Sequence, residues 1–116
     1  MPETYLMKLD DIPFKATQSG KKIIEVRLND DKRKEIKVGD IILFENLNDR
    51  ETVMVEVVRV RKFKTLSELV KTEDFSKTGG IYRDRKHWQK SINSYYTPEK
   101  QRSFGLLVIE ISLADL

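Results

Sequence analysis

One short stretch of the chain brings together residue types that can bind a polar ligand or assist its chemistry. The stretch GKKIIEVR (20–27) has the apolar residues of a β-strand but carries charges at Lys22, Glu25 and Arg27. Side chains two residues apart on a strand point to the same face, so Glu25 and Arg27 share one face. Lys22 lies at the first residue of this strand, where its flexible stem can bend toward either face. The three groups could line a polar pocket, or could form an exposed ion pair of little energetic weight.

Each residue of this stretch has a distinct chemical capacity. Arg27 can form a forked contact with a phosphate or with Glu25. A desolvated Lys22 can serve as a base or nucleophile, whereas a Lys22 paired with Glu25 serves as a cation. Gly20 allows the backbone to leave a preceding helix in the left-handed conformation. The residue types alone leave these alternatives open.

Two further segments are rich in basic residues. RVRKFK (59–64) contains no acid, and RDRKHWQK (83–90) contains only one. Basic segments interleaved with aromatic residues suit phosphate contact and base stacking. We therefore take Arg59 and Arg61, with Gly20 and Lys21, as candidate contacts to a nucleic acid. The alternative is simple surface decoration, because 35% of the chain is charged.

The aromatic residues allow a similar choice. Tyr95 and Tyr96 precede a helix cap and could stack on a base, although packing is the commoner role, and Tyr96 is retained as a candidate. Trp88 could stack, or could be the apolar anchor of an otherwise polar helix. His87 is expected to have no chemical role.

Composition excludes several classes of protein. At 116 residues the chain predicts one domain, 1–116, with enough length for one core. No apolar run approaches the roughly 18 residues of a membrane helix, so no membrane partner is expected. The absence of cysteine excludes disulfides, and a single histidine disfavours a catalytic zinc site, so no metal or cofactor is expected. The start of the chain lacks a signal pattern, and we expect a cytoplasmic protein.

Periodicity and turn signals predict a small set of elements. Thr65 with Glu68 forms a capping-box pattern, and Thr97-Pro98 is typical of a helix start. The predicted strands are 5–9, 22–28, 41–47, 51–63 and 104–113, with a bend or bulge in the fourth, and the predicted helices are 12–19, 66–72, 83–93 and 98–102. These elements predict an α+β but mostly β fold, a small barrel with short helices covering its openings.

The pattern Gly-x-Lys-x-x-Glu-x-Arg at 20–27 resembles the signature of ASCH domains, which belong to the PUA-like superfamily. The flanks IKVGDIILFEN (36–46), VEVVRVRKFKTLSEL (55–69) and YYTPEKQRSFGLLVIEISL (95–113) resemble the segments that follow in that family. The resemblance implies a PUA-like β-barrel, close to that of RNA-binding PUA domains, with a cleft beside the motif.

The resemblance also implies a range of activities. ASCH domains are proposed to bind RNA, some small bacterial members deacetylate N4-acetylcytidine, and some are reported to be ribonucleases. The motif lysine of the deacetylating members is catalytic, and Lys22 occupies its position. Those enzymes have a threonine where this chain has Glu25. The second acidic residue of those enzymes lies in the region after the fourth strand. In this chain Glu73 and Asp74 are near that place.

Our hypothesis is that the chain binds RNA, a nucleotide or a nucleoside in a cleft lined by the motif. One alternative is a small hydrolase in which Lys22 and Glu25 are catalytic, acting on a modified nucleoside or as a ribonuclease. Another is a protein-interaction domain that has lost the ligand. We expect Lys22, Glu25 and Arg27 to line one cleft with a residue of segment 93–97.

Overall fold

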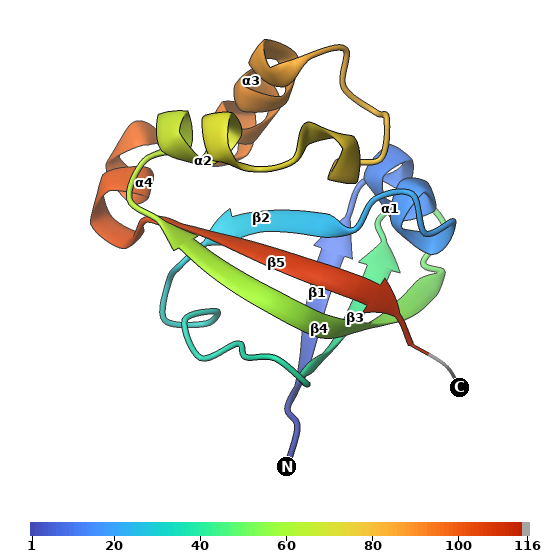
Figure 1. The fold of residues 1–116 in the computed structure, drawn as a ribbon. Coiled ribbons are helices and arrows are strands. Elements are labelled where there is room, and N and C mark those ends of the chain that lie inside the picture. Colours follow the sequence, from blue (N-terminus) through green and yellow to red (C-terminus); the bar gives the residue numbers. More distant parts are fainter. Residues whose placement is uncertain (115–116) are drawn as a thin grey trace.

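The computed structural model describes residues 1–114, and its centre is a mixed sheet that curves into a half-barrel (Figure 1). The strands are β1 (Thr4–Leu9), β2 (Ile24–Leu28), β3 (Ile41–Asn46), β4 (Thr52–Phe63) and β5 (Leu106–Leu113). Their order is β1-β3-β4-β5-β2, in which β1 runs parallel to β3 and the other pairs are antiparallel. β1 and β2 are therefore the two edges of the sheet.

Short helices cover the half-barrel and follow the predicted start signals. They are α1 (Asp11–Gln18), α2 (Leu66–Thr72), α3 (Arg85–Tyr95) and α4 (Pro98–Phe104), with a 3₁₀ turn η1 (Phe75–Lys77). α2, α3 and α4 gather on one side of the sheet, and α1 lies near the end of β1 and β3 (Figure 1). The hydroxyls of Thr65 and Thr97 accept hydrogen bonds from the amides of Glu68 and Lys100, as N-caps do.

Apolar side chains pack on both faces of the sheet and form two cores. The core inside the half-barrel includes Phe14, Phe44 and Val55, and the core beneath the helices includes Leu69 and Trp88. β5 serves both, because its successive side chains point to opposite faces and four in a row are fully buried. This arrangement confirms the predicted α+β fold, a small barrel with helices over its openings. Helix and strand have roughly equal shares, so strands dominate less than predicted.

The structure departs from the predicted element bounds at a few places. β2 begins at Ile24 rather than at Lys22, which forms an isolated bridge with Thr78 instead. The predicted irregularity in the fourth strand is confirmed as a register shift between Val57 and Arg59. α3 starts later than predicted because Asp84 caps it, accepting a hydrogen bond from the amide of His87.

The 3₁₀ turn η1 was not predicted. It is short, and Asp74 supplies its cap by accepting a hydrogen bond from the amide of Ser76. Within residues 1–114, none of the helices has the length and apolar character needed to cross a membrane.

Candidate functional site

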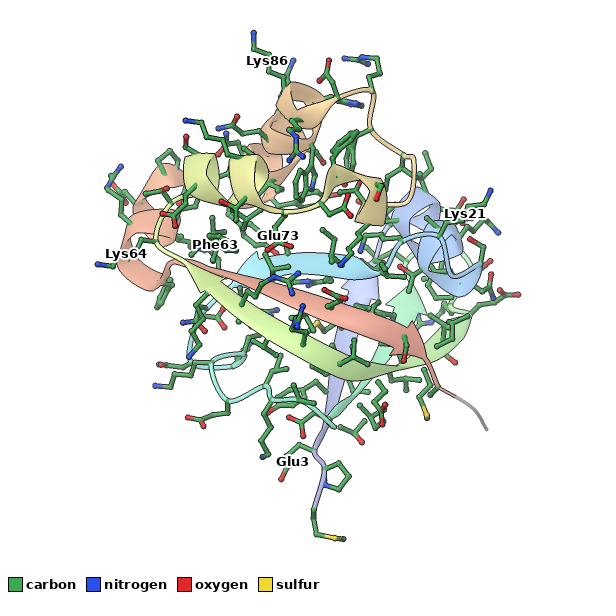
Figure 2. The ribbon with its side chains drawn as sticks, viewed as in Figure 1. Glu3, Lys21, Phe63, Lys64, Glu73 and Lys86 are labelled. Atoms are coloured by element: carbon green, nitrogen blue, oxygen red, sulfur yellow. The ribbon has the colours of Figure 1, made fainter. Side chains whose placement is uncertain are left out.

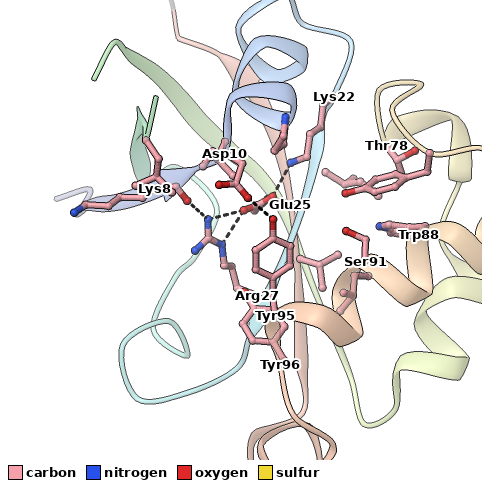
Figure 3. A pocket seen from close by; sticks show the side chains of 17 residues that line it. Lys8, Asp10, Lys22, Glu25, Arg27, Thr78, Trp88, Ser91, Tyr95 and Tyr96 are labelled. Carbon is pink, nitrogen blue, oxygen red and sulfur yellow. Dashed lines mark hydrogen bonds and ion pairs between the residues drawn. The ribbon is translucent and has the colours of Figure 1, made fainter. Parts of the chain in front are cut away.

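A cleft of about 160 Å³ opens beside the two edge strands and is covered by α3 (Figure 3). We call it the motif cleft, because Lys22, Glu25 and Arg27 all line it. Tyr95 and Tyr96 line it as well, which confirms the expected juxtaposition of the motif with segment 93–97. The motif charges thus face a shared hollow instead of spreading over a solvated sheet face.

Glu25 lies at the centre of the charged side of the motif cleft. Its carboxylate accepts a 2.6 Å hydrogen bond from Lys22 Nζ at one oxygen and a 2.7 Å bond from Arg27 Nε at the other. Only 6% of Glu25 is exposed. Burial on its own would raise the pKa of Glu25, but the charges of Lys22 and Arg27 and their hydrogen bonds together lower it. Glu25 is therefore an ionised acceptor fixed between two cations.

Arg27 also connects the two edges of the sheet. Its Nη2 donates a 2.9 Å hydrogen bond to the main-chain oxygen of Lys8 on β1 (Figure 3). The side chain of Arg27 is only 13% exposed, so the guanidinium forms part of the wall rather than extending into solvent.

Lys22 keeps hydrogen-bonding capacity for a ligand. A lysine ammonium has three N–H donors, and in residues 1–114 the only side-chain or main-chain partner of Lys22 Nζ is Glu25. The residue is only 5% exposed, and it lines the cleft. Because buried donors need acceptors, the remaining N–H groups favour an oxygen or a lone pair in the cleft.

Contacts from neighbouring segments fix the backbone at Lys22. The amide of Lys22 donates to the oxygen of Ala16, and Lys22 pairs with Thr78. Gly79 packs directly against it: a Cβ on Gly79 would lie 2.7 Å from Lys22 Cβ, and the φ of Gly79 is +92°. No local sequence pattern predicts this contact of Gly79 with Lys22.

Aromatic side chains form the opposite wall of the motif cleft. Tyr82, Trp88, Tyr95 and Tyr96 line it, together with Ser91. Trp88 is 3% exposed and belongs to the core beneath the helices, so it both anchors α3 and borders the cleft. Burial raises the pKa of the hydroxyls of Tyr82 and Tyr96, which are therefore neutral donors at physiological pH.

Tyr95 reaches across the cleft. Its hydroxyl donates to the carboxylate of Asp10, which lies between β1 and α1 (Figure 3). This hydrogen bond, and then burial, raise the pKa of Tyr95 to about 12. Asp10 occupies the N-cap position of α1, but its side chain makes no cap hydrogen bond and is therefore available to Tyr95.

Arg61, a predicted nucleic-acid contact, lies outside the cleft in an ion-pair network. Its Nε and Nη2 donate to Glu73 at 2.7 and 2.6 Å, and its Nη1 lies 3.0 Å from Glu110. Lys77 also lies 3.4 Å from Glu110. Glu73 lies beneath α2 (Figure 2). Its carboxylate contacts Arg61, and Glu73 does not line the motif cleft. Asp74 is exposed and caps η1.

The other predicted residues are also outside the motif cleft. Gly20 ends α1 with a φ of +82°, in agreement with its expected conformation. Lys21 is exposed and points away from the body of the protein (Figure 2), and Arg59 is exposed on β4. Lys8, Tyr82 and Ser91 also line the motif cleft and were not predicted, because their place there depends on tertiary packing.

Comparison with known proteins identifies the fold. The model of the ASCH domain family matches residues 7–114. The crystal structure of hypothetical protein PH0355 is 28% identical, with a TM-score of 0.84 over 96% of this chain and 99% of that one. The solution structure of protein PF0455 from Pyrococcus furiosus is 26% identical, with a TM-score of 0.76 over 97% of this chain and 99% of that one.

More distant structures share the fold. The ASCH domain from Lactobacillus crispatus is 13% identical, with a TM-score of 0.65 over 94% of this chain and 79% of that one. The comparison with curated proteins gives no match. The chain belongs to the ASCH domain family, a PUA-like family suggested to bind RNA.

Proposed function

We propose that the motif cleft binds a nucleobase, presented by RNA, a nucleotide or a nucleoside. The observation that carries the proposal is the position of Glu25 between Lys22 and Arg27, opposite an aromatic wall. A base needs both halves of such a site: flat apolar contact for its ring and fixed donors and acceptors for its edge.

The charged side of the cleft can read the edge of a base. The free N–H groups of Lys22 can donate to a carbonyl oxygen or ring nitrogen, and the ionised carboxylate of Glu25 can accept from an exocyclic amine. Because two cations hold Glu25 in one orientation, its side chain loses little conformational entropy when a ligand binds. The hydroxyls of Tyr82 and Tyr96 add neutral donors on the opposite side.

The single tryptophan supplies a direct binding assay. Trp88 lines the cleft, so titration with a base that enters should change its fluorescence. We would test the four ribonucleosides, N4-acetylcytidine and short single-stranded RNAs. Lys22→Met should weaken binding by about tenfold or more, because a charge-assisted hydrogen bond is lost.

The matched control is Lys21→Met, which removes the same charge from the neighbouring exposed residue, outside the cleft. It should bind like the wild type. Absence of binding to any of these ligands, or equal weakening by the two variants, would contradict the proposal.

A second candidate function is hydrolysis of an acylated nucleoside such as N4-acetylcytidine. The observation in its favour is the pair of free donors on buried Lys22, which could stabilise the oxyanion formed when water attacks the acetyl carbonyl. The C–N bond would then break to release cytidine and acetate. Against this reading, the lowered pKa of Glu25 makes its carboxylate a poor base near neutral pH.

Incubation with N4-acetylcytidine separates the two functions. If the protein is catalytic, the wild type should release cytidine and Lys22→Met should not. Binding alone predicts intact N4-acetylcytidine after prolonged incubation at high protein concentration, and intact RNA in a parallel sample. If binding alone operates, Lys22→Arg should retain most of the affinity, because it keeps a cationic donor.

A further inference from the structure

A second concave region lies next to the motif cleft on the outer side of β1. This region, the outer hollow, has a volume of about 440 Å³ and shares Lys8 and Arg27 with the motif cleft. Arg27 therefore stands between the two, with its Nε and Nη2 bound to Glu25 and the Lys8 oxygen. The two concavities therefore adjoin at Arg27, and a ligand long enough to extend past this residue would reach the outer hollow.

The charged residues of the outer hollow are mainly basic. Lys8, Arg27 and Arg33 line it, whereas its single acid, Glu45, lies 3.6 Å from Arg50. Lys8 is exposed, and no carboxylate of residues 1–114 lies within ion-pair distance of it. Arg33 uses Nη1 for Asp30 and has further N–H groups for another acceptor. These groups match the charge of a phosphate.

The floor of the outer hollow is apolar. Leu6 is 77% exposed there, and Leu43 lies directly beside it on β3. Leu6 and Lys8 are two residues apart on β1, so both point to the same outer face. An apolar floor beside cations suits a sugar or base attached to a phosphate better than it suits a free inorganic ion.

The geometry points to the outer hollow as the binding site for the phosphate attached to a base in the motif cleft, with the adjoining nucleotide resting on Leu6. This inference rests on the proposed function and narrows its ligand class to a nucleotide or an RNA strand, in preference to a free nucleoside. Lys8 and Arg33 are the phosphate contacts, and Arg27 joins the base site to the phosphate site.

Calorimetric titration of each ribonucleoside, its 5′- and 3′-monophosphates and inorganic phosphate tests this inference. We expect at least one monophosphate to bind about tenfold more tightly than its nucleoside, since charge-assisted hydrogen bonds are among the stronger ones. Inorganic phosphate alone should bind far more weakly, because it lacks the base.

Arg33→Gln isolates the phosphate contact, because Arg33 lines the outer hollow but not the motif cleft. It should remove most of the tenfold advantage and leave the nucleoside affinity unchanged. Lys8→Gln should also reduce the tighter binding of the monophosphate. It gives a second test of the phosphate site if loss of the Arg33–Asp30 ion pair disrupts the segment between β2 and β3. Lys32→Gln is the control, since Lys32 is exposed next to Arg33 and lines neither concavity.

The outcomes distinguish this inference from the proposed function. Tight nucleoside binding with no gain from a phosphate, or equal effects of Arg33→Gln and Lys32→Gln, overturns the phosphate site and leaves the base site intact. If neither nucleosides nor monophosphates bind, both proposals fail. With a short RNA, each lost phosphate contact should make the slope of log affinity against log salt shallower by about 0.7.

Discussion

Arg27 Nη2 lies 2.9 Å from the main-chain oxygen of Lys8, and this hydrogen bond joins the two edge strands of the sheet. No ladder of main-chain hydrogen bonds connects β1 to β2 in the described part of the chain. A side chain therefore spans the opening of the half-barrel at the place where the motif cleft lies. The same guanidinium orients Glu25, so the closure of the fold and the geometry of the site depend on one residue.

The first prediction concerns this closure. Arg27→Gln should lower the free energy of unfolding by about 3 kcal/mol, because Glu25 would remain buried with one of its two cations removed. Urea unfolding measures the change. Arg50→Gln breaks an exposed ion pair and should shift stability by no more than about 0.5 kcal/mol. Similar stability of the two variants would contradict a structural role for Arg27.

The second prediction concerns pH. The pKa of Glu25 in the folded protein lies below its ordinary value of 4.5, so the carboxylate contributes stability at pH values above 4.5. This contribution is lost as the pH falls through the folded pKa. The wild type should be more stable than Glu25→Gln near pH 7, and the difference between them should shrink steadily below about pH 4.5.

The difference between the two proteins is the relevant quantity, because Glu110 also has a lowered pKa and lowers the stability of both proteins in acid. Chemical unfolding at pH 7, 4.5 and 3 provides the comparison. A stability difference that stays constant over this range would show that Glu25 does not ionise as a paired carboxylate.

The third prediction tests the contact between Gly79 and Lys22. Gly79→Ala should be clearly more destabilising than Gly80→Ala. Both residues have positive φ, so each alanine carries a cost of about 1–2 kcal/mol for the left-handed conformation. Only at position 79 would the new Cβ meet another residue, since a Cβ on Gly80 has no heavy atom within 4 Å.

Binding of a nucleoside should separate the two glycine variants further. Gly79→Ala displaces Lys22 and should weaken binding, whereas Gly80→Ala should bind like the wild type. Thermal unfolding and Trp88 fluorescence titration measure the two effects. Equal stability and equal affinity of the two variants would show that Gly79 does not position Lys22.

The fourth prediction concerns the network of Arg61, Glu73 and Glu110. It anchors the segment before Thr78, in which the oxygen of Lys77 accepts a hydrogen bond from the amide of Ile23. Glu73→Gln should loosen this segment and increase hydrogen exchange at the Ile23 amide by about tenfold. Glu68→Gln removes an exposed acid from the same region and should leave the exchange rate unchanged.

Much of the fold could be predicted because its signals are local. Alternation fixed the strands to within a few residues, and Thr65, Pro98 and Gly20 marked helix boundaries through short-range chemistry. The motif charges could also be assigned to one site, because spacing along β2 determines which side chains share a face. The expected pairing of Glu25 with Arg27 rested on this rule, whereas Lys22 was grouped with them because its flexible stem can reach either face.

The remainder of the site depended on contacts between distant residues. Arg61 belongs to a basic run in the sequence, yet its partner Glu73 is 12 positions away and becomes adjacent only when α2 folds back. Tyr95 meets Asp10 across 85 positions. Composition and periodicity contain no information about such pairs. A basic residue in a charged run of the sequence can therefore have its donors paired with distant carboxylates in the folded protein.

The double role of β5 has a consequence for the order in which the protein matures. The strand Leu106–Leu113 supplies Leu107 and Ile109 to one core and Leu106 and Val108 to the other. A nascent polypeptide emerging from the ribosome cannot complete either core before this strand is released. Both sides of the molecule consequently consolidate together once this strand is available, and a truncation before Leu106 would leave no independently stable half.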